Sequence, residues 1–180
     1  MTDLFEGTCG PVPAGTRITQ PFGYDPTYPG NAQHVHYGVD FGVYYVPTTA
    51  PCAYTVDLAG WWENTGYGNV VLGYYDDPDG TRWWILQAHL SEVHVYPGQR
   101  VQPGQVVGIT GNSGFSTGAH LHFARGRNGH DNAHWEDPLP WLESEEDDMA
   151  GFTDAEKTAL HELAALHIDG RTFAPGTPGR

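Results

Sequence analysis

The chain has 180 residues, which is enough for one domain with a buried core and a short appendage. Its 8 basic and 22 acidic residues give a formal net charge of −14, which argues against nucleic acid and anionic membranes as partners, because both require a basic surface. Many glycines (24) and prolines (14), with 13% aromatic residues, are typical of short strands joined by tight turns rather than of a disordered chain.

The first part of the chain predicts a β domain. Residues 1–16 contain glycine and proline without periodicity, so we expect an irregular lead-in. Residues 17–142 show no helical periodicity and carry short strand-like runs separated by Pro-Gly and Asp-Gly turns. These runs fall at 17–22, 37–43, 52–59, 69–75, 81–88, 106–110 and 119–124. We therefore predict a mainly β domain at 17–142, with a small antiparallel sheet or sandwich.

The composition changes after this domain. Acidic residues dominate the start of 143–151, which predicts a solvated linker. Within 152–180, Thr153 and Glu156 form a capping box, and leucines follow at helical spacing, so we predict a helix at 153–168 and a loose tail. A single helix of this length is marginal in water. We expect it to pack on the domain, on a second copy of the chain or on a further domain.

The two cysteines, Cys9 and Cys52, are too few for a cysteine-rich zinc site or a disulfide framework. A single disulfide between them and two separate thiols both remain open. No basic segment followed by an apolar core begins the chain, and no apolar stretch is long enough to span a bilayer, so we expect neither a signal peptide nor a membrane helix.

The histidines give the strongest functional signal. His36 and Asp40 are four residues apart, and His120 and His122 are two apart, so on strands each pair shares one face. Each motif alone is common by chance, but the two together in one small domain indicate a metal centre. His36, Asp40 and His122 would supply three ligands for zinc, and a water would complete a tetrahedral catalytic site.

Other site motifs have the wrong spacing. His161-Glu162 lacks a second histidine at the distance that an H-E-x-x-H motif requires, and residues 111–115 lack the second glycine of a nucleophile elbow. Pro-Gly-Gln segments also occur in lipoyl and biotinyl carrier modules, which need a lysine on a hairpin. The only lysine, Lys157, lies in the predicted helix, so we exclude the carrier function.

Four segments follow one another in the β domain: HYGVDF at 36–41, QAHLS at 87–91, PGQRVQPGQVVG at 97–108 and TGNSGFSTGAHLHF at 110–123. In this order they resemble the lysostaphin-type zinc endopeptidases, which cut peptide crosslinks in bacterial cell walls. Residues 18–23, ITQPFG, also resemble the first strand of these enzymes. The resemblance covers about residues 17–125, and it implies an antiparallel β fold with long loops around a groove.

The same resemblance implies one zinc ion, held by His36, Asp40 and His122. His89 and His120 match the two catalytic histidines that do not bind the metal. Because the chain has no H-E-x-x-H glutamate, a histidine must carry the proton. We expect His120 to act as the general base toward the zinc-activated water, and His89 to stabilise the oxyanion or orient the water, although the two roles can be exchanged. The implied substrate is a peptide crosslink or stem peptide of peptidoglycan.

Further expectations concern the substrate. Some members of the family have a tyrosine a few residues before the first histidine ligand that binds the reacting group. Here the nearest candidate, Tyr28, lies eight residues before His36, which departs from that spacing. Asn69 and Ser116 are expected to touch the substrate backbone. In each of the pairs Trp61-Trp62 and Trp83-Trp84, one side chain is expected in the core and the other is a candidate for the groove.

An alternative function is a catalytically inactive module of the same fold that binds the wall or activates another hydrolase. The complete set of ligands disfavours it. The expected setting is a bacteriophage lysin or virion-associated enzyme, or a secreted enzyme without its leader. We expect peptidoglycan peptide as the partner, no nucleic acid and no membrane, with a homodimer or a further domain as a candidate partner of the helix at 153–168.

Overall fold

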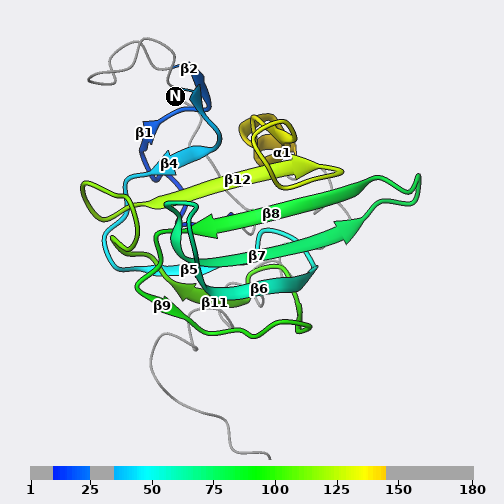
Figure 1. Ribbon diagram of the computed structural model, residues 1–180, viewed down its shortest axis with the longest axis horizontal. Helices are drawn as coiled ribbons and strands as arrows, with labels where there is room; N and C mark the ends of the chain where they lie inside the picture. The colour runs from blue at the N-terminus through cyan, green and yellow to red at the C-terminus, as the bar shows by residue number, and fades with distance from the viewer. Residues whose placement is uncertain (1–9, 25–34, 145–180) are drawn as a thin grey trace, which may run out of the picture.

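The longest strands of the protein form one antiparallel sheet. A computed structural model describes residues 10–24 and 35–144 (Figure 1). Within these ranges the main sheet has eight strands in the order β1-β4-β12-β8-β7-β6-β10, with β13 paired to β12. Their bounds are β1 Ile18–Gln20, β4 Val39–Phe41, β12 Leu121–Arg127, β8 Arg82–Ala88, β7 Gly68–Asp76, β6 Tyr54–Trp62, β10 Arg100–Val101 and β13 Trp135–Glu136.

Two smaller sheets and one helix complete the described part of the chain. The three-stranded sheet has the order β5-β11-β9, and β2 pairs with β3. The bounds are β2 Gly23–Tyr24, β3 Val35–His36, β5 Pro47–Thr49, β9 Glu92–Val93, β11 Val106–Ile109 and α1 Leu139–Ser144. Figure 1 shows α1 beside β12. The predicted mainly β, antiparallel fold is confirmed. No helix in the described ranges has the length and apolar character needed to cross a membrane.

The central strands are buried on both faces. In β8, Ile85 and Leu86 are both fully buried, although adjacent side chains of a strand point to opposite faces. Ile85 belongs to a cluster that includes Val107 of β11 and Leu142 of α1, so the smaller sheet and the helix cover this face. Leu86 belongs to a second cluster on the other face, against which Tyr67 is partly buried. Both clusters together hold the strands that carry the site described below.

A buried polar network ties the two sheets together. The Tyr54 hydroxyl donates a hydrogen bond to Oε1 of Gln87 (3.0 Å), and Nε2 of Gln87 donates to Oγ1 of Thr48 (2.7 Å) and to the carbonyl of Thr49 (2.9 Å). Tyr54, Gln87 and Thr48 are fully buried, so these bonds replace those that water would make. The network fixes the end of β8 just before the site.

The structure corrects several predicted strands. Those at 17–22, 52–59, 69–75, 81–88, 106–110 and 119–124 occur as β1, β6, β7, β8, β11 and β12 with shifted ends. The strand at 37–43 is shorter than predicted, because β4 covers only three residues and Gly38 separates it from β3. The short strands β2, β3, β5, β9, β10 and β13 were not separately predicted, because two or three residues show no periodicity.

A short helix, α1, ends the described part of the chain, although residues 17–142 show no helical periodicity. α1 begins at Leu139, whose backbone N–H donates to Oδ1 of Asp137 (3.1 Å), and Trp141 stacks on Phe123 with ring centroids 6.5 Å apart. A six-residue helix shows no readable periodicity and is stabilised by such packing rather than by propensity. The predicted linker begins inside α1, and the helix predicted at 153–168 lies outside the described residues, as does Cys9.

Candidate functional site

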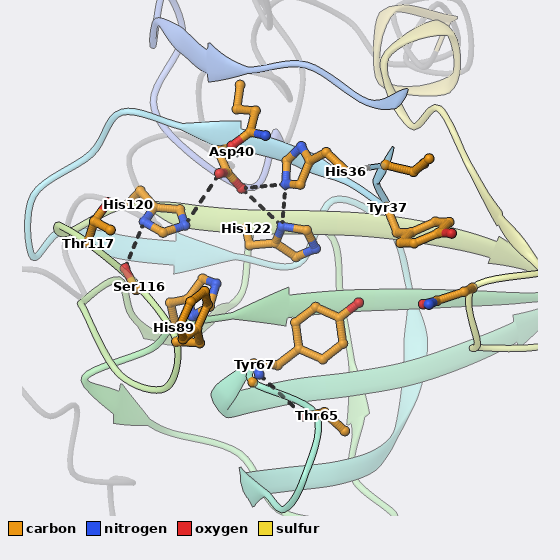
Figure 2. A pocket seen from close by; sticks show the side chains of 15 residues that line it. His36, Tyr37, Asp40, Thr65, Tyr67, His89, Ser116, Thr117, His120 and His122 are labelled. Carbon is orange, nitrogen blue, oxygen red and sulfur yellow. Dashed lines mark hydrogen bonds and ion pairs between the residues drawn. The ribbon is translucent and has the colours of Figure 1, made fainter. Parts of the chain in front are cut away.

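A cleft of about 460 Å³ opens beside β4, β12 and the end of β8 (Figure 2). Its remaining walls come from the turn between β6 and β7 and from the loop that precedes β12. The backbone N–H of Phe115 donates to the Gly66 carbonyl (2.7 Å), which joins these two walls. The lining side chains include Gln20, Val35, His36, Tyr37, Asp40, Thr65, Tyr67, His89, Phe115, Ser116, Thr117, His120, His122 and Asn132. All five residues expected to bind metal or to act in catalysis therefore meet in one cleft.

The three expected ligands meet through strand pairing. Asp40 in β4 is the direct partner of His122 in β12, so their side chains leave the same face of the sheet. His36 ends β3 and lies at the same place. Oδ1 of Asp40 is 3.1 Å from Nε2 of His36 and 3.0 Å from Nδ1 of His122, and these two nitrogens are 3.0 Å apart (Figure 2).

Hydrogen bonding directs a lone pair of His36 toward the other two ligands. Nδ1 of His36 lies 2.9 Å from the Pro21 carbonyl, which only accepts, so this nitrogen carries the proton of the neutral ring. Nε2 then presents its lone pair to Asp40 and His122. With the His122 proton on Nε2, three electron-rich atoms lie within 3.1 Å of one another, an arrangement that a bound cation stabilises.

The three residues fit a zinc ion. Tetrahedral zinc holds nitrogen and oxygen ligands at about 2.0–2.2 Å, which places neighbouring ligand atoms about 3.3–3.6 Å apart. The observed separations of 3.0–3.1 Å would need to widen by only about 0.2–0.6 Å around an ion of this size. Two imidazoles and one carboxylate are also a donor set of catalytic zinc, with a remaining position for water.

The electrostatics of the site favour charge states that bind a cation. Burial raises the pKa of Asp40, but hydrogen bonds with His122 and His36 outweigh burial and hold that pKa well below its usual range. Burial also lowers the pKa of His122. At neutral pH the carboxylate is therefore ionised and the imidazole is neutral, as metal binding requires.

The two other histidines lie together on the neighbouring wall, with ring centroids 4.6 Å apart. Nδ1–H of His89 donates to the Ser113 carbonyl (2.8 Å), and Nδ1–H of His120 donates to the Gly118 carbonyl (2.8 Å). In their neutral forms both rings consequently carry the lone pair on Nε2. Nε2 of His120 is 3.5 Å from Oδ2 of Asp40, which places it beside the metal ligands (Figure 2).

The backbone of His89 is strained. Its φ of 60° lies in the left-handed region, which costs a non-glycine residue about 1–2 kcal/mol. Burial lowers the pKa of His89 to about 4, and the charges of His120 and His122 act in the same direction. His89 is therefore neutral at pH 7 and able to accept a hydrogen bond at Nε2.

Of the three residues expected to contact the substrate, the structure places one, Ser116, in the lining of the cleft. The Ser116 hydroxyl donates to the Gly118 carbonyl (2.8 Å) beside His120. The side-chain amide of Asn69 donates to the Leu90 carbonyl (3.3 Å), and Asn69 is not among the described residues that line the cleft. Tyr28 lies outside the described residues.

The tryptophan pairs do not line the cleft in the described structure. Trp62 stacks on Tyr67 at 5.6 Å, and Trp84 packs on Tyr74 at 5.4 Å. Arg125 lies 3.4 Å from the ring of Trp83, and Trp61 is exposed. Their expected role in the groove is therefore not supported.

Sequence reasoning missed Tyr67, which lines the cleft with its ring 5.2 Å from that of His122. Tyr67 stands between Gly66 and Gly68, whose φ values of 84° and 68° belong to the left-handed region. The Gly-Tyr-Gly triplet directly before the strand-like run at 69–75 was the available signal, since two glycines around an aromatic residue indicate a sharply bent backbone.

Comparisons with known proteins agree with this geometry. The family described as Peptidase family M23 matches residues 34–133. Lysostaphin of Staphylococcus staphylolyticus is 38% identical over 133 residues, which are 73% of this chain and 27% of that protein. The glycyl-glycine endopeptidase ALE-1 of Staphylococcus capitis is 39% identical over 124 residues, 68% of this chain and 33% of that protein. The chain thus spans about a third or less of these relatives.

Comparison with solved structures agrees with the sequence comparison. The catalytic domain of lysostaphin from Staphylococcus simulans superposes with a TM-score of 0.60 and 36% sequence identity. The match covers 71% of this chain and 92% of that domain. The similarity therefore concerns the β domain that carries the cleft.

Proposed function

The chain belongs to Peptidase family M23, and from this membership we propose that it is a zinc-dependent endopeptidase that hydrolyses peptide bonds of bacterial peptidoglycan. One observation carries the proposal. The three electron-rich ligand atoms of His36, Asp40 and His122 lie within 3.1 Å of one another. They share a cleft with His89 and His120, which are not part of the ligand set and whose Nδ1–H groups donate to backbone carbonyls. These groups are the ones that a metal-assisted hydrolysis with a histidine as general base requires.

His36, Asp40 and His122 hold the zinc ion in this proposal. Zinc bound there supplies the acidification of water and the polarisation of the scissile carbonyl. His120 acts as the general base, because its Nε2 lone pair lies on the Asp40 side of the cleft, and it then returns the proton to the leaving amine. Oδ2 of Asp40, 3.5 Å away, stabilises the positive charge that His120 gains in between.

The tautomer of His89 favours one of its two expected roles. Stabilising an oxyanion requires an N–H donor, but Nδ1–H of His89 is already given to the Ser113 carbonyl and its pKa is lowered to about 4. A neutral Nε2 accepts a hydrogen bond instead. We therefore assign His89 to orienting the attacking water.

The cleft favours an uncharged peptide. Among its described lining residues Asp40 is the only acidic side chain, and neither lysine nor arginine is present. A charged residue next to the scissile bond would find no countercharge on these walls. This supports cleavage within a glycine-rich crosslink, the type of bond named for the similar glycyl-glycine endopeptidase. Tyr28, Asn69 and Ser116 stay as predicted substrate contacts.

Alanine substitutions at the two histidines test the catalytic assignment. His120→Ala and His89→Ala should each lower the rate of peptide release from peptidoglycan by about 10²-fold or more, while zinc content stays at one ion per chain. His94→Ala is the matched control, because His94 is exposed and pairs with Glu92 (2.9 Å) outside the cleft. A double variant at His89 and His120 that stays fully active would contradict the assignment.

The alternative function, an inactive module that binds the wall or activates another hydrolase, predicts a different result. The wild-type chain would then bind peptidoglycan without releasing peptides, and neither histidine substitution would change its behaviour. The complete ligand set and both further histidines support the enzyme instead.

Two finer proposals rest on the sequence. We infer that the helix predicted at 153–168 joins a second copy or a further domain, and sedimentation of the chain with and without residues 149–180 tests the second copy. An unchanged monomer in both would refute the homodimer. We also retain the bacteriophage lysin or a secreted wall enzyme as the setting, which identification of the encoding genome would decide.

A further inference from the structure

One ring nitrogen of the metal site lacks the usual support. His122 is 4% exposed, and its Nε2 has no hydrogen-bond partner in the described structure. A histidine that binds metal normally donates its other N–H to a carbonyl or carboxylate, which fixes the ring. His36 has such a partner in the Pro21 carbonyl (2.9 Å), but His122 does not. Another contact must therefore fix the orientation of the His122 ring.

Tyr67 supplies that contact. Its ring centroid is 5.2 Å from that of His122 with an interplanar angle of 35°, and it stacks in turn on Trp62 at 5.6 Å and 26°. Figure 2 shows the Tyr67 ring next to His122 in the cleft. The backbone at Gly38 closes another side, since a Cβ there would lie 2.6 Å from Nε2 of His122.

The position of Tyr67 is itself well determined. Its carbonyl accepts a hydrogen bond from the backbone N–H of His89 (3.0 Å), and its hydroxyl is hydrogen-bonded to the side chain of Trp135. A Cβ on the following Gly68 would lie 2.6 Å from the backbone nitrogen of Gly114, so this turn is packed tightly against the loop before β12. A ring held in this way has little freedom to move with its neighbour.

We propose that Tyr67 is a positioning residue that orients the metal ligand His122 through the tilted packing of the two rings, in place of the hydrogen bond that Nε2 lacks. The inference rests on the proposed function only in taking zinc as the ion that the site binds. Loss of the ring leaves His122 free to rotate about its side-chain bonds, and Nδ1 then spends less time facing His36 and Asp40. The hydroxyl group of Tyr67 makes no hydrogen bond to Nε2 of His122, and the backbone contacts of the turn are expected to hold the ring without it.

Three variants test the proposal through metal affinity. Tyr67→Leu removes the ring, Tyr67→Phe keeps it without the hydroxyl, and Tyr74→Leu is the matched control, because Tyr74 packs on Trp84 at 5.4 Å and does not line the cleft. Zinc affinity is measured by competition with a chromophoric chelator, and cobalt substitution reports the ligand geometry through its visible absorption.

Tyr67→Leu should bind zinc about tenfold more weakly or worse and should change the cobalt spectrum, as expected for the loss of a group that supports a ligand. Tyr67→Phe and Tyr74→Leu should keep both properties. Zinc affinity of Tyr67→Leu within about threefold of wild type, with an unchanged spectrum, would overturn the proposal. So would a tenfold loss in Tyr67→Phe, which remains decisive if the leucine variant fails to fold. These affinities need no hydrolysis, so a wild-type protein that binds zinc but cuts nothing would refute only the proposed function.

Discussion

Replacing Gly38 by alanine should disturb the metal site and destabilise the fold, because the structure leaves no space for the added methyl group. A Cβ at this position would lie 2.6 Å from both Cε1 and Nε2 of His122 and 2.6 Å from the backbone oxygen of Phe123. Phe123 pairs with β4 on one side and with β8 on the other, so its carbonyl is held in the sheet. The His122 ring must therefore move, and overpacking of this kind costs about 1–3 kcal/mol.

The same displacement should weaken metal binding. If about 1.4 kcal/mol of the cost falls on the geometry of Nδ1 of His122, zinc affinity falls tenfold. Competition with a chelator measures this loss, and urea unfolding of the zinc-free protein measures the remainder. Gly118→Ala is the control, since its Cβ would meet nothing within 4 Å. A Gly38→Ala variant with wild-type zinc affinity and unfolding free energy would refute the steric argument.

Three further predictions follow from buried groups and from the metal. Tyr54→Phe removes the donor to Oε1 of buried Gln87 (3.0 Å) and should lower the free energy of unfolding in urea by about 1–3 kcal/mol, whereas no change would contradict the network. The pKa of His89 is lowered to about 4 in the folded protein, from a value near 6.5 in the unfolded chain. Between about pH 6.5 and pH 4 the unfolded chain therefore binds more protons than the folded protein. The unfolding free energy of the zinc-free protein should consequently fall as the pH falls through this range. His89→Gln should reduce this dependence, and an equal dependence in both proteins would count against it. Chelation should lower the melting temperature in calorimetry, because zinc at about 1,000 times its Kd stabilises the folded state by about 4 kcal/mol, and an unchanged melting temperature would speak against a bound ion.

The residues of the metal site could be predicted from short spacings. His36 and Asp40, like His120 and His122, are separated by distances that place them on one face of a strand, and the fold brings the two pairs together by pairing Asp40 with His122. The strands β6, β7 and β8 were also predicted, because each is at least seven residues long and rich in β-branched or aromatic residues.

Other features depend on contacts that the sequence does not reveal. α1 owes its stability to Trp141 packing on Phe123. The orientations of His36 and His89 depend on the carbonyls of residues that are distant in the sequence, Pro21 and Ser113. The contact of Tyr67 with His122 joins residues 55 positions apart in different elements. Local spacing carries no information on such pairs, so only the folded structure identifies them.

Mass spectrometry of the fragments released from purified peptidoglycan tests the central claim most directly. Walls with glycine crosslinks and walls with direct crosslinks are incubated with the protein, with and without a zinc chelator. The account predicts new glycine termini from the first type of wall, which disappear with the chelator and return when zinc is added. Peptide termini that form equally with the chelator, or no new termini from any wall, would contradict a zinc endopeptidase.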